Sequence, residues 1–271
     1  MKFIFAKFCL FLSHFIDFVR RRIIDPPPGS VNYRPKYHYT WGMTKTNYDY
    51  YKEDEVKSSY EHFKKYFPSS VFFTTSTEIR REIINKAIRY SLDKKQLNKL
   101  QNQEDEFFLE FGVFNALSTN IFSKQLKLEK YKLFAFDSFE GLLEDQIGHI
   151  GNYKGKFNRF KKIPKLESNV SPVVGWIQDT LPIFLKEKVN DKFKIRFIHI
   201  DVDTYETTKY ILENLKKYLV KDSIILFDEL YNMQGWRVGE YKALIETFSE
   251  EEYSYIGFTA YGEQVAIKIN K

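Results

Sequence analysis

The sequence predicts an α/β protein with a mostly parallel, seven-stranded sheet that ends in an antiparallel hairpin, preceded by an N-terminal helical extension. From residue 106 onward, short and uniformly apolar runs alternate with segments of helical periodicity. Such strands, separated by helices, are typical of βαβ units in a parallel sheet covered on both faces. The last two runs are instead joined by a short turn containing Tyr261 and Gly262, which indicates a hairpin.

The expected elements follow from these patterns. Strands are predicted at residues 107–109, 132–136, 172–174, 195–200, 223–227, 253–259 and 264–269. Helices are predicted at residues 53–66, 75–92, 207–219 and 238–248. The second of these begins with Thr75 and Glu78, which have the spacing of a capping box. Thr180 is expected to cap a further helix that begins at Pro182.

Residues 1–70 are predicted to form the extension, and residues 71–271 the main domain with a lid loop at about 142–170. The uncharged run at residues 8–16 is shorter than the ~20 residues of a membrane-spanning helix. No small-residue cleavage site follows it, so a signal peptide is not expected. Two interpretations stay open for residues 1–24: an amphipathic helix in peripheral contact with a membrane, or a helix packed on the main domain or a second copy.

Composition limits the classes of function. The 271 residues carry a net charge of +6, and this charge is largely dispersed. It suggests affinity for anionic partners, but no nucleic-acid motif accompanies it, so no nucleic-acid partner is predicted. The single cysteine, Cys9, excludes an intrachain disulfide and a cysteine metal cluster, which fits a cytoplasmic location.

Polar residues follow the apolar runs, where open parallel sheets bind their ligands. Glu110 and Gly112 follow the first run, and a glycine there lets the backbone approach a ligand closely. Asp137 ends the second run, near the spacing expected of an acid that binds ribose hydroxyls; a cap on the next helix is an equal alternative. Gln178 and Asp179 follow the third run, where a nucleobase could be hydrogen-bonded.

The fourth and fifth runs end in acids. Neighbouring strands would bring Asp201, Asp228 and Glu229 to one edge of the sheet. Carboxylates that share a site raise each other's pKa unless a cation compensates them. Oxygen ligands suit Mg²⁺, so a magnesium site is predicted. Asp203 and Glu206 are interpreted instead as salt-bridged surface groups or helix caps.

These motifs together resemble the macrocin O-methyltransferase family of class I S-adenosylmethionine-dependent methyltransferases, over residues 108–248. The matching motifs are Glu-Phe-Gly-Val (110–113), Phe-Asp-Ser-Phe-Glu-Gly-Leu (136–142), Gly-Lys-Phe (155–157), Asp-Thr-Leu-Pro (179–182), His-x-Asp-x-Asp-x-Tyr-Glu-x-Thr (199–208), Phe-Asp-Glu (227–229) and Gly-Trp (235–236). The resemblance implies a Rossmann-like methyltransferase fold. It also implies Mg²⁺-dependent methylation of a hydroxyl group on a small molecule, with a saccharide as the expected acceptor.

The resemblance implies site residues as well. Those expected to bind S-adenosylmethionine are Glu110, Gly112, Ser118, Asp137, Ser138, Gln178, Asp179 and Asp201. Asp201, Asp228 and Glu229 are expected to hold Mg²⁺, with Asp201 as the catalytic base. The chain departs from the family at Glu229, where an aspartate is usual, and at Ala116-Leu117, where two glycines are usual. The bulky Leu117 is therefore expected near the cofactor loop.

Several alternatives stay open. Ala116-Leu117 suggests a non-catalytic binding module with a methyltransferase-like fold. An O-methyltransferase could also act on a catechol-like or lipid-linked hydroxyl. A nicotinamide dehydrogenase is disfavoured, because no Gly-x-Gly-x-x-Gly motif follows the first strand. The basic lid residues could bind an acidic saccharide or be solvated, and self-association is left open.

Overall fold

The computed structural model describes residues 45–74, 79–93 and 105–271. Residues 54–271 form one compact unit, which therefore includes part of the stretch that the sequence assigned to the extension. The predicted helix within residues 1–24 and the Thr75–Glu78 capping box lie outside the described residues. Within the described part of the chain, none of the helices has the length and hydropathy needed to cross a membrane.

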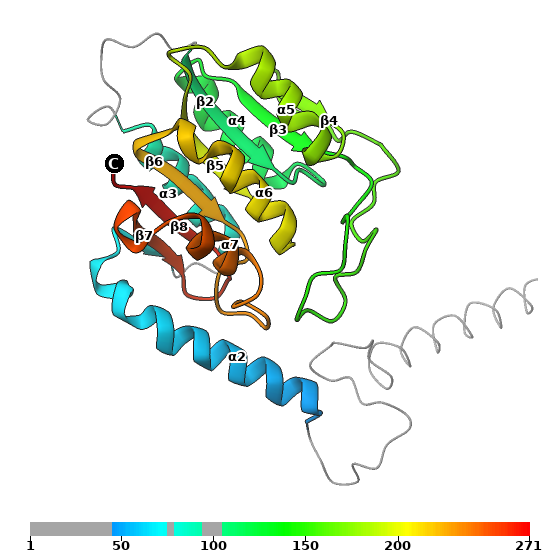
Figure 1. The fold of residues 1–271 in the computed structure, drawn as a ribbon, viewed down its shortest axis with the longest axis vertical. Helices are drawn as coiled ribbons and strands as arrows, with labels where there is room; N and C mark the ends of the chain where they lie inside the picture. Colours follow the sequence, from blue (N-terminus) through cyan, green and yellow to red (C-terminus); the bar gives the residue numbers. More distant parts are fainter. Residues whose placement is uncertain (1–44, 75–78, 94–104) are drawn as a thin grey trace, which may run out of the picture. The chain divides into compact units, whose positions relative to one another are not determined.

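A single eight-stranded sheet forms the centre of this unit (Figure 1). Its order is β1-β7-β8-β6-β5-β2-β3-β4, and β8 runs antiparallel to both of its neighbours, β6 and β7. The other neighbouring strands pair in parallel. The strands are β1 (Phe72–Thr74), β2 (Glu106–Phe111), β3 (Leu133–Asp137), β4 (Val170–Val174), β5 (Lys194–Ile200), β6 (Leu219–Phe227), β7 (Tyr253–Thr259) and β8 (Val265–Ile269).

The seven predicted strands are confirmed, and the eighth, β1, is an addition. It has only three residues and pairs with β7 at the sheet edge. Gly257 of β7 makes room for it, because a side chain at this position would overlap the ring of Phe72. Three residues are too few to show a period in the sequence, so the strand could not be predicted from its own pattern.

Helices cover both faces of the sheet, as expected. They are α2 (Asn47–Phe63), α3 (Ile79–Ser91), α4 (Leu117–Leu128), α5 (Ile177–Lys188), α6 (Tyr205–Leu215) and α7 (Glu240–Thr247). Short 3₁₀ turns are η2 (Lys64–Ser69), η4 (Lys216–Tyr218) and η5 (Glu250–Glu252). The four helices predicted from periodicity are confirmed, with ends shifted by a few residues.

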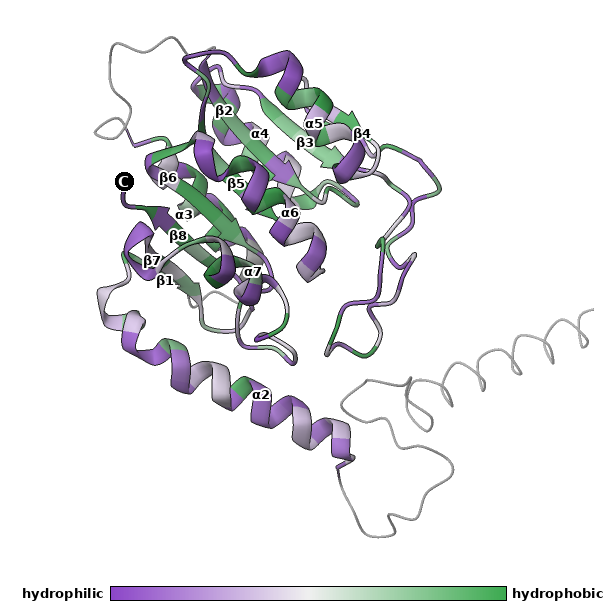
Figure 2. Cartoon of the chain, viewed as in Figure 1, coloured by the Kyte–Doolittle hydropathy of each residue, from purple (hydrophilic) through white to green (hydrophobic). Residues whose placement is uncertain are grey.

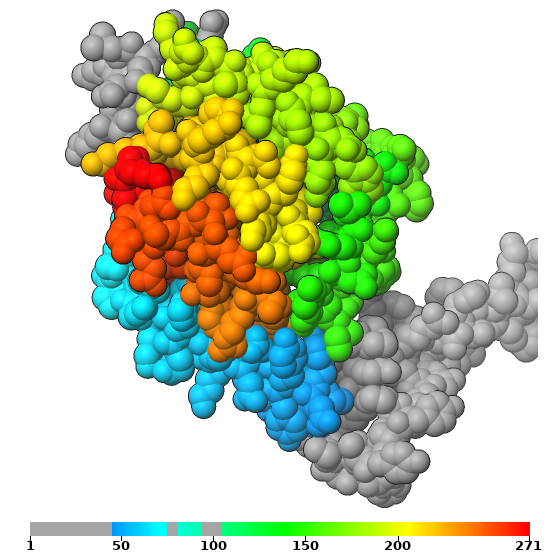
Figure 3. Space-filling model, in the orientation of Figure 1, coloured from blue at the N-terminus to red at the C-terminus, as the bar shows by residue number. Residues whose placement is uncertain are grey.

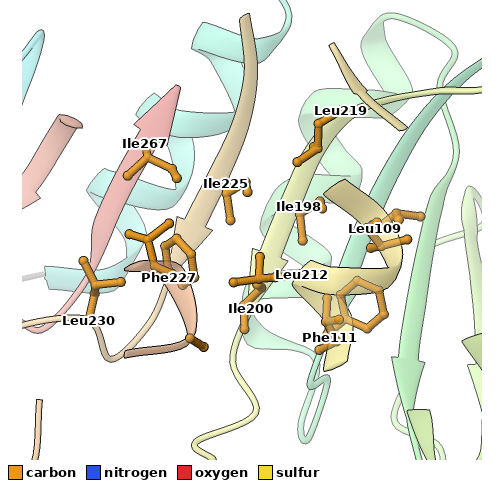
Figure 4. Close-up of a cluster of buried hydrophobic side chains, with 14 of the residues drawn as sticks. Leu109, Phe111, Ile198, Ile200, Leu212, Leu219, Ile225, Phe227, Leu230 and Ile267 are labelled. Carbon is orange, nitrogen blue, oxygen red and sulfur yellow. The ribbon is translucent and has the colours of Figure 1, made fainter. Parts of the chain in front are cut away.

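Two apolar layers hold the helices to the sheet. On one face, α3 and α4 pack on side chains such as Phe108 and Phe197. On the other face, α5, α6 and α7 pack on Leu109, Phe111 and Ile198, part of the cluster drawn in Figure 4. Figure 2 shows the inner strands in hydrophobic colours, while the helices carry hydrophilic segments. Burial on both faces explains why the strands read as continuous apolar runs.

The strand order reverses between β2 and β5. From β2 the chain proceeds outward through β3 to β4, and then returns to the opposite side of β2 with β5 and β6. Ligands of open α/β sheets bind outside the carboxyl ends of the strands at such a switch point. The topology therefore predicts a site between the loops that follow β2 and β5.

Helix α5 begins earlier than expected. It starts at Ile177 rather than near Pro182, so Thr180 does not cap it and instead donates its hydroxyl to the Trp176 carbonyl. Proline removes one backbone donor from a helix, which here would have served the carbonyl of Gln178. The Tyr210 hydroxyl donates to that carbonyl at 3.3 Å and replaces the missing bond.

A buried ion pair joins the amino-terminal ends of the two central strands. Glu106 of β2 accepts bonds at 2.7 Å from both the Nε and the Nη2 atoms of Arg196 in β5. Its second oxygen accepts the Tyr131 hydroxyl at 2.7 Å. All three side chains are buried, so the carboxylate is fully paired away from water.

Candidate active site

A cavity opens at the switch point, beyond the carboxyl ends of the strands. Its walls come from the turn after β2, the end of β3, the loop between β3 and β4, the start of α5, and the loops after β5 and β6. The lining residues are Gly112, Phe114, Phe136, Asp137, Ser138, Gly141, Leu142, Leu143, Phe157, Trp176, Ile177, Gln178, Asp201, Val202, Asp203, Thr207, Asp228 and Glu229.

The turn after β2 requires glycine. Gly112 has a φ of +89°, and a Cβ atom there would overlap the backbone carbonyl of Asp201. The amide of Gly112 donates to the Phe136 carbonyl at 2.9 Å, and the amide of Asp201 donates to the Phe111 carbonyl at 2.9 Å. The turns after β2 and β5 are thereby held in direct contact, with no side chain between them.

Asp137 organises this turn. One carboxylate oxygen accepts the amides of Val113 and Phe114 at 2.8 Å each, and the other accepts the amide of Phe139 at 2.7 Å. No helix directly follows β3, so the predicted alternative of a helix cap does not apply. An ionised carboxylate offers about four acceptor sites, and three are used here. One site is left for a ligand in the cavity.

The opposite wall combines apolar surface with a few polar groups. Trp176 and Ile177 line it at the start of α5. The Gln178 side chain reaches the Thr207 hydroxyl at 3.5 Å, and both residues line the cavity. Apolar walls with a small number of fixed polar groups are typical of sites for small organic ligands.

Four acids line the far end of the cavity. Asp201 and Asp203 follow β5, while Asp228 and Glu229 follow β6. The amide of Asp228 donates to the Ile200 carbonyl at 3.0 Å, which continues the pairing of β5 and β6 up to these acids. Of the three acids predicted to hold magnesium, Asp201 and Asp228 each have a ligand atom within 4.8 Å of the other, and Glu229 lines the same cavity. That these acids bind a metal stays a prediction.

A fifth acid lies behind these four. Glu240, at the start of α7, is fully buried and accepts the amide of Glu229 at 2.9 Å. Burial, together with the charges of Asp228, Asp201 and Asp203, raises the pKa of Glu240 well above its ordinary value. Burial and the charges of Asp203 and Asp228 likewise raise the pKa of Glu229. Clustered carboxyl groups of this kind ionise more readily when a cation lies among them.

The loop between β3 and β4, residues 138–169, is tied to these acids and is not simply solvated. Gln146 donates its amide to Glu229 and accepts a bond from Asn152 at 2.6 Å. Asn152 also donates to Asp203 at 3.1 Å, and Lys156 donates to Asn152. In Figure 3 the green atoms of this loop lie beside the yellow and orange segments that follow β5 and β6.

Asp203 was assigned from the sequence to the surface or to a helix cap, and this interpretation is wrong. The residue is only 8% exposed, lines the cavity and has a φ of +60°. Nothing in its sequence context separates it from Glu206, which is exposed in the first turn of α6. The loop residues Gln146 and Asn152 were missed as well, because they come from a long segment without a period.

Three predicted cofactor residues do not line the cavity. Glu110 is fully buried against His199, Ser118 is buried in α4, and Asp179 is exposed on α5. The other predicted cofactor and metal residues all line it: Gly112, Asp137, Ser138, Gln178, Asp201, Asp228 and Glu229. A direct role for Glu110, Ser118 or Asp179 stays a prediction.

The two positions that depart from the family's glycines are accommodated. Ala116 is fully buried with a φ of +63°, a conformation that costs a non-glycine residue about 1–2 kcal/mol. Leu117 is 53% exposed and does not line the cavity. The bulky side chain therefore leaves the site open.

The chain is similar to known methyltransferase proteins in sequence and in fold. Residues 109–230 match the profile of a methyltransferase domain. The chain is also similar to the crystal structure of CalS11, a calicheamicin methyltransferase, with a TM-score of 0.53 and 20% identity over 78% of this chain and 91% of that one. The fold is that of a class I methyltransferase. Two further structures are similar to this chain at a lower TM-score.

The first of the two is apo CalS11, named as a TDP-rhamnose 3'-O-methyltransferase, with 20% identity, a TM-score of 0.49 and coverage of 70% of this chain and 78% of that chain. The second is the O-methyltransferase NovP, with 18% identity, a TM-score of 0.49 and coverage of 71% and 80%. Comparison with curated proteins gives no match. Open α/β sheets bind their ligands where the strand order reverses, and the cavity lies at that point here.

Proposed function

We propose that this chain is an S-adenosylmethionine-dependent O-methyltransferase that acts on a hydroxyl group with the help of a divalent cation. One observation carries the proposal. The glycine turn and Asp137 open into the same cavity as Asp201, Asp203 and Asp228. A nucleoside-binding half and an acidic half are thereby joined in a single site.

The nucleoside-binding half fits S-adenosylmethionine. Asp137 has one acceptor site left for a ribose hydroxyl after its three backbone bonds. Gln178 offers an amide beside the apolar wall of Trp176 and Ile177, which suits an adenine ring. Gly112 keeps the backbone of the turn clear of side chains.

The acidic half fits a hard divalent cation, for which Mg²⁺ is the expectation from the sequence. Asp201, Asp228 and Glu229 would hold it through carboxylate oxygens. The raised pKa of Glu229 and of Glu240 supports a cation here, because a positive charge would lower the cost of ionising clustered acids.

When bound, the cofactor supplies an electrophilic methyl group, and the cation lowers the pKa of the acceptor hydroxyl. The chain's own residues align the two reactants. Leu142 and Phe157 add apolar surface to the cavity wall, and alignment itself lowers the barrier. Asp201 accepts the hydroxyl proton, and the buried Asp203 lines the same cavity.

A saccharide acceptor is the form of the proposal that has most support. The family resemblance points to sugar hydroxyls, and the similar structure CalS11 is named as a calicheamicin methyltransferase. Lys154, Lys161 and Lys162 are exposed on the loop that reaches the acids. They would attract an acidic group on such an acceptor.

Two measurements test this function. Isothermal titration calorimetry with S-adenosylhomocysteine measures cofactor binding, and transfer of a radiolabelled methyl group to glycosylated, catechol-like and lipid-linked acceptors measures turnover. We expect binding and turnover on a glycosylated acceptor in the wild type. In Asp201→Asn we expect near-normal binding and a loss of turnover. Binding without any turnover in the wild type would favour the non-catalytic module, and no binding would refute both.

A further inference from the structure

His199 lies directly beneath the acidic half of the cavity. It is the penultimate residue of β5, and its side chain is fully buried. The imidazole Nδ1 atom lies 3.1 Å from Oε1 of Glu110 on the neighbouring strand β2. The ring is also held edge-on by Phe122 of α4, with ring centroids 5.0 Å apart. Its orientation is thus fixed from two sides.

The second ring nitrogen of His199 points toward the acids. Its Nε2 atom lies 4.0 Å from Oδ1 of Asp228, which is too long for a hydrogen bond. Among the described residues, Nε2 is a buried atom without a hydrogen-bond partner. A buried polar atom left in this way costs about 1–3 kcal/mol, so its position calls for an explanation.

Glu110 selects which nitrogen carries the proton. An ionised carboxylate is an acceptor only, so it favours hydrogen on Nδ1 of His199. The lone pair of Nε2 then faces Asp228. Two electron-rich atoms at 4.0 Å repel each other unless a positive charge lies near both. This is the arrangement of a histidine ligand whose other nitrogen is oriented by a carboxylate.

Three groups could share one ion at this point. His199, Asp201 and Asp228 each offer one ligand atom, and these atoms all lie within 4.8 Å of one another. Asp201 and Asp228 line the cavity, whereas His199 approaches from the core side. Neighbouring acids by themselves do not identify a metal site. The buried Nε2 atom of His199, which has no hydrogen-bond partner among the described residues, is a second and separate indication of a cation here.

We propose that Nε2 of His199 is a ligand of the divalent cation, together with Asp201 and Asp228, and that Glu110 orients it. This inference rests on the proposed function for the presence of a cation in the site. It adds a nitrogen ligand to a set that the sequence predicted to contain oxygen alone. It also gives the buried Glu110 a role that does not require contact with the cofactor.

A nitrogen ligand changes which cation the site prefers. Mg²⁺ is a hard ion that favours oxygen ligands, whereas imidazole favours first-row transition metals. The site should therefore bind Mn²⁺ and Co²⁺ more tightly than Mg²⁺. Replacing His199 by glutamine removes the nitrogen ligand. We expect this substitution to weaken Mn²⁺ binding at least ~10-fold and Mg²⁺ binding less, so that the two affinities become more similar.

Electron spin-echo envelope modulation of bound Mn²⁺ tests the ligand directly. The sample is the full chain without a polyhistidine tag, one preparation labelled with ¹⁵N-histidine and one unlabelled, with Mn²⁺ as the only addition. We expect a directly coordinated ¹⁵N coupling in the wild type. It should disappear in His199→Gln and persist in the matched controls at the other four histidines, His14→Gln, His38→Gln, His62→Gln and His149→Gln.

The wild-type spectrum decides the question even if His199→Gln does not fold. Stoichiometric Mn²⁺ without histidine coupling, or a coupling that survives in His199→Gln, would overturn the inference, as would no Mn²⁺ binding at all. The function is judged separately by S-adenosylhomocysteine binding and turnover. Glu110→Gln gives a second arm: as an orienting residue, it should weaken Mn²⁺ binding by ~10–100-fold while the coupling persists in the ion that still binds.

Discussion

Gly112 and Asp201 touch backbone to backbone, so that a methyl group on Gly112 would overlap the carbonyl oxygen of Asp201. We therefore expect Gly112→Ala to lower the free energy of unfolding by more than about 3 kcal/mol. The substitution combines the cost of a positive φ in a residue with a side chain, about 1–2 kcal/mol, with a displacement of two strand ends. Urea denaturation followed by circular dichroism measures the effect.

Gly155→Ala is the matched control for this prediction. Gly155 has a similar φ of +81°, but a Cβ atom there would meet nothing within 4 Å. Its cost should be limited to the conformational penalty of about 1–2 kcal/mol. Equal losses in the two alanine variants would mean that the contact with Asp201 is not important for stability.

Because several acids lie close together in the cavity, we expect Asp228→Asn to raise the stability of the protein without metal and to lower it, relative to the wild type, when metal is bound. In EDTA, Asp228→Asn should be more stable than the wild type, on the order of 1 kcal/mol, because one of several neighbouring negative charges is removed. The amide oxygen can still accept the bond that Gln264 donates at 3.2 Å. Thermal unfolding in EDTA measures this difference.

Added Mn²⁺ should reverse the order. A ligand at about 100 times its dissociation constant stabilises the folded state by about 2.7 kcal/mol, and only the wild type has the full set of carboxylates. The melting temperature of the wild type should rise with Mn²⁺ concentration, while that of Asp228→Asn should rise much less. Equal shifts would place the binding ion elsewhere.

The buried ion pair of Glu106 and Arg196 lies at the opposite end of the strands from the cavity. Breaking this pair should strongly lower the free energy of unfolding without directly changing the site. Glu106→Gln removes the carboxylate charge that pairs with the buried Arg196 guanidinium. Breaking a buried pair in this way typically costs about 3–5 kcal/mol. Glu61→Gln is the control, because it breaks an exposed pair with Lys64 and should cost under about 0.5 kcal/mol. Guanidinium denaturation compares the two variants.

His62 predicts a pH dependence of stability. Its pKa lies below the ordinary value of 6.5, first because of partial burial and then because of the charges of Lys65 and Arg237. As the pH falls below about 6.5, the unfolded chain takes up a proton that folded His62 resists, so stability is lost on that side. As the pH is lowered from 7.5 to 5.5, the wild type should therefore lose the stability that depends on neutral His62, while His62→Gln should not. The difference between their free energies of unfolding should become smaller. A difference that does not change with pH would contradict this.

The sequence predicted the architecture well because burial on two faces leaves a strong pattern. Each of the seven longer strands contains a short apolar run. Hydrogen bonds that set the ends of individual helices were harder to predict from the sequence. The start of α5 was misplaced because Pro182 looked like a first helical residue, whereas its missing bond is replaced by Tyr210, which lies distant in the sequence.

The acidic site was predicted only in part for a similar reason. Asp201 and Asp228 end neighbouring strands, so topology alone brings them together. Glu240 and Asn152 join them from α7 and from the loop between β3 and β4, and no spacing rule connects such segments to a sheet edge. From the sequence alone, His199 has the pattern of an ordinary buried strand residue. Its proposed role becomes visible only from its contact with Glu110 on the neighbouring strand.

The three amide bonds to Asp137 have a consequence for the kinetics of ligand binding. One carboxylate already holds the backbone amides of Val113, Phe114 and Phe139, so the turn needs no reordering to bind the nucleoside of the proposed cofactor. A pre-organised receptor forfeits little conformational entropy on association. The on-rate at this half of the cavity should then be limited by diffusional encounter, and slow steps should arise only where the acceptor enters.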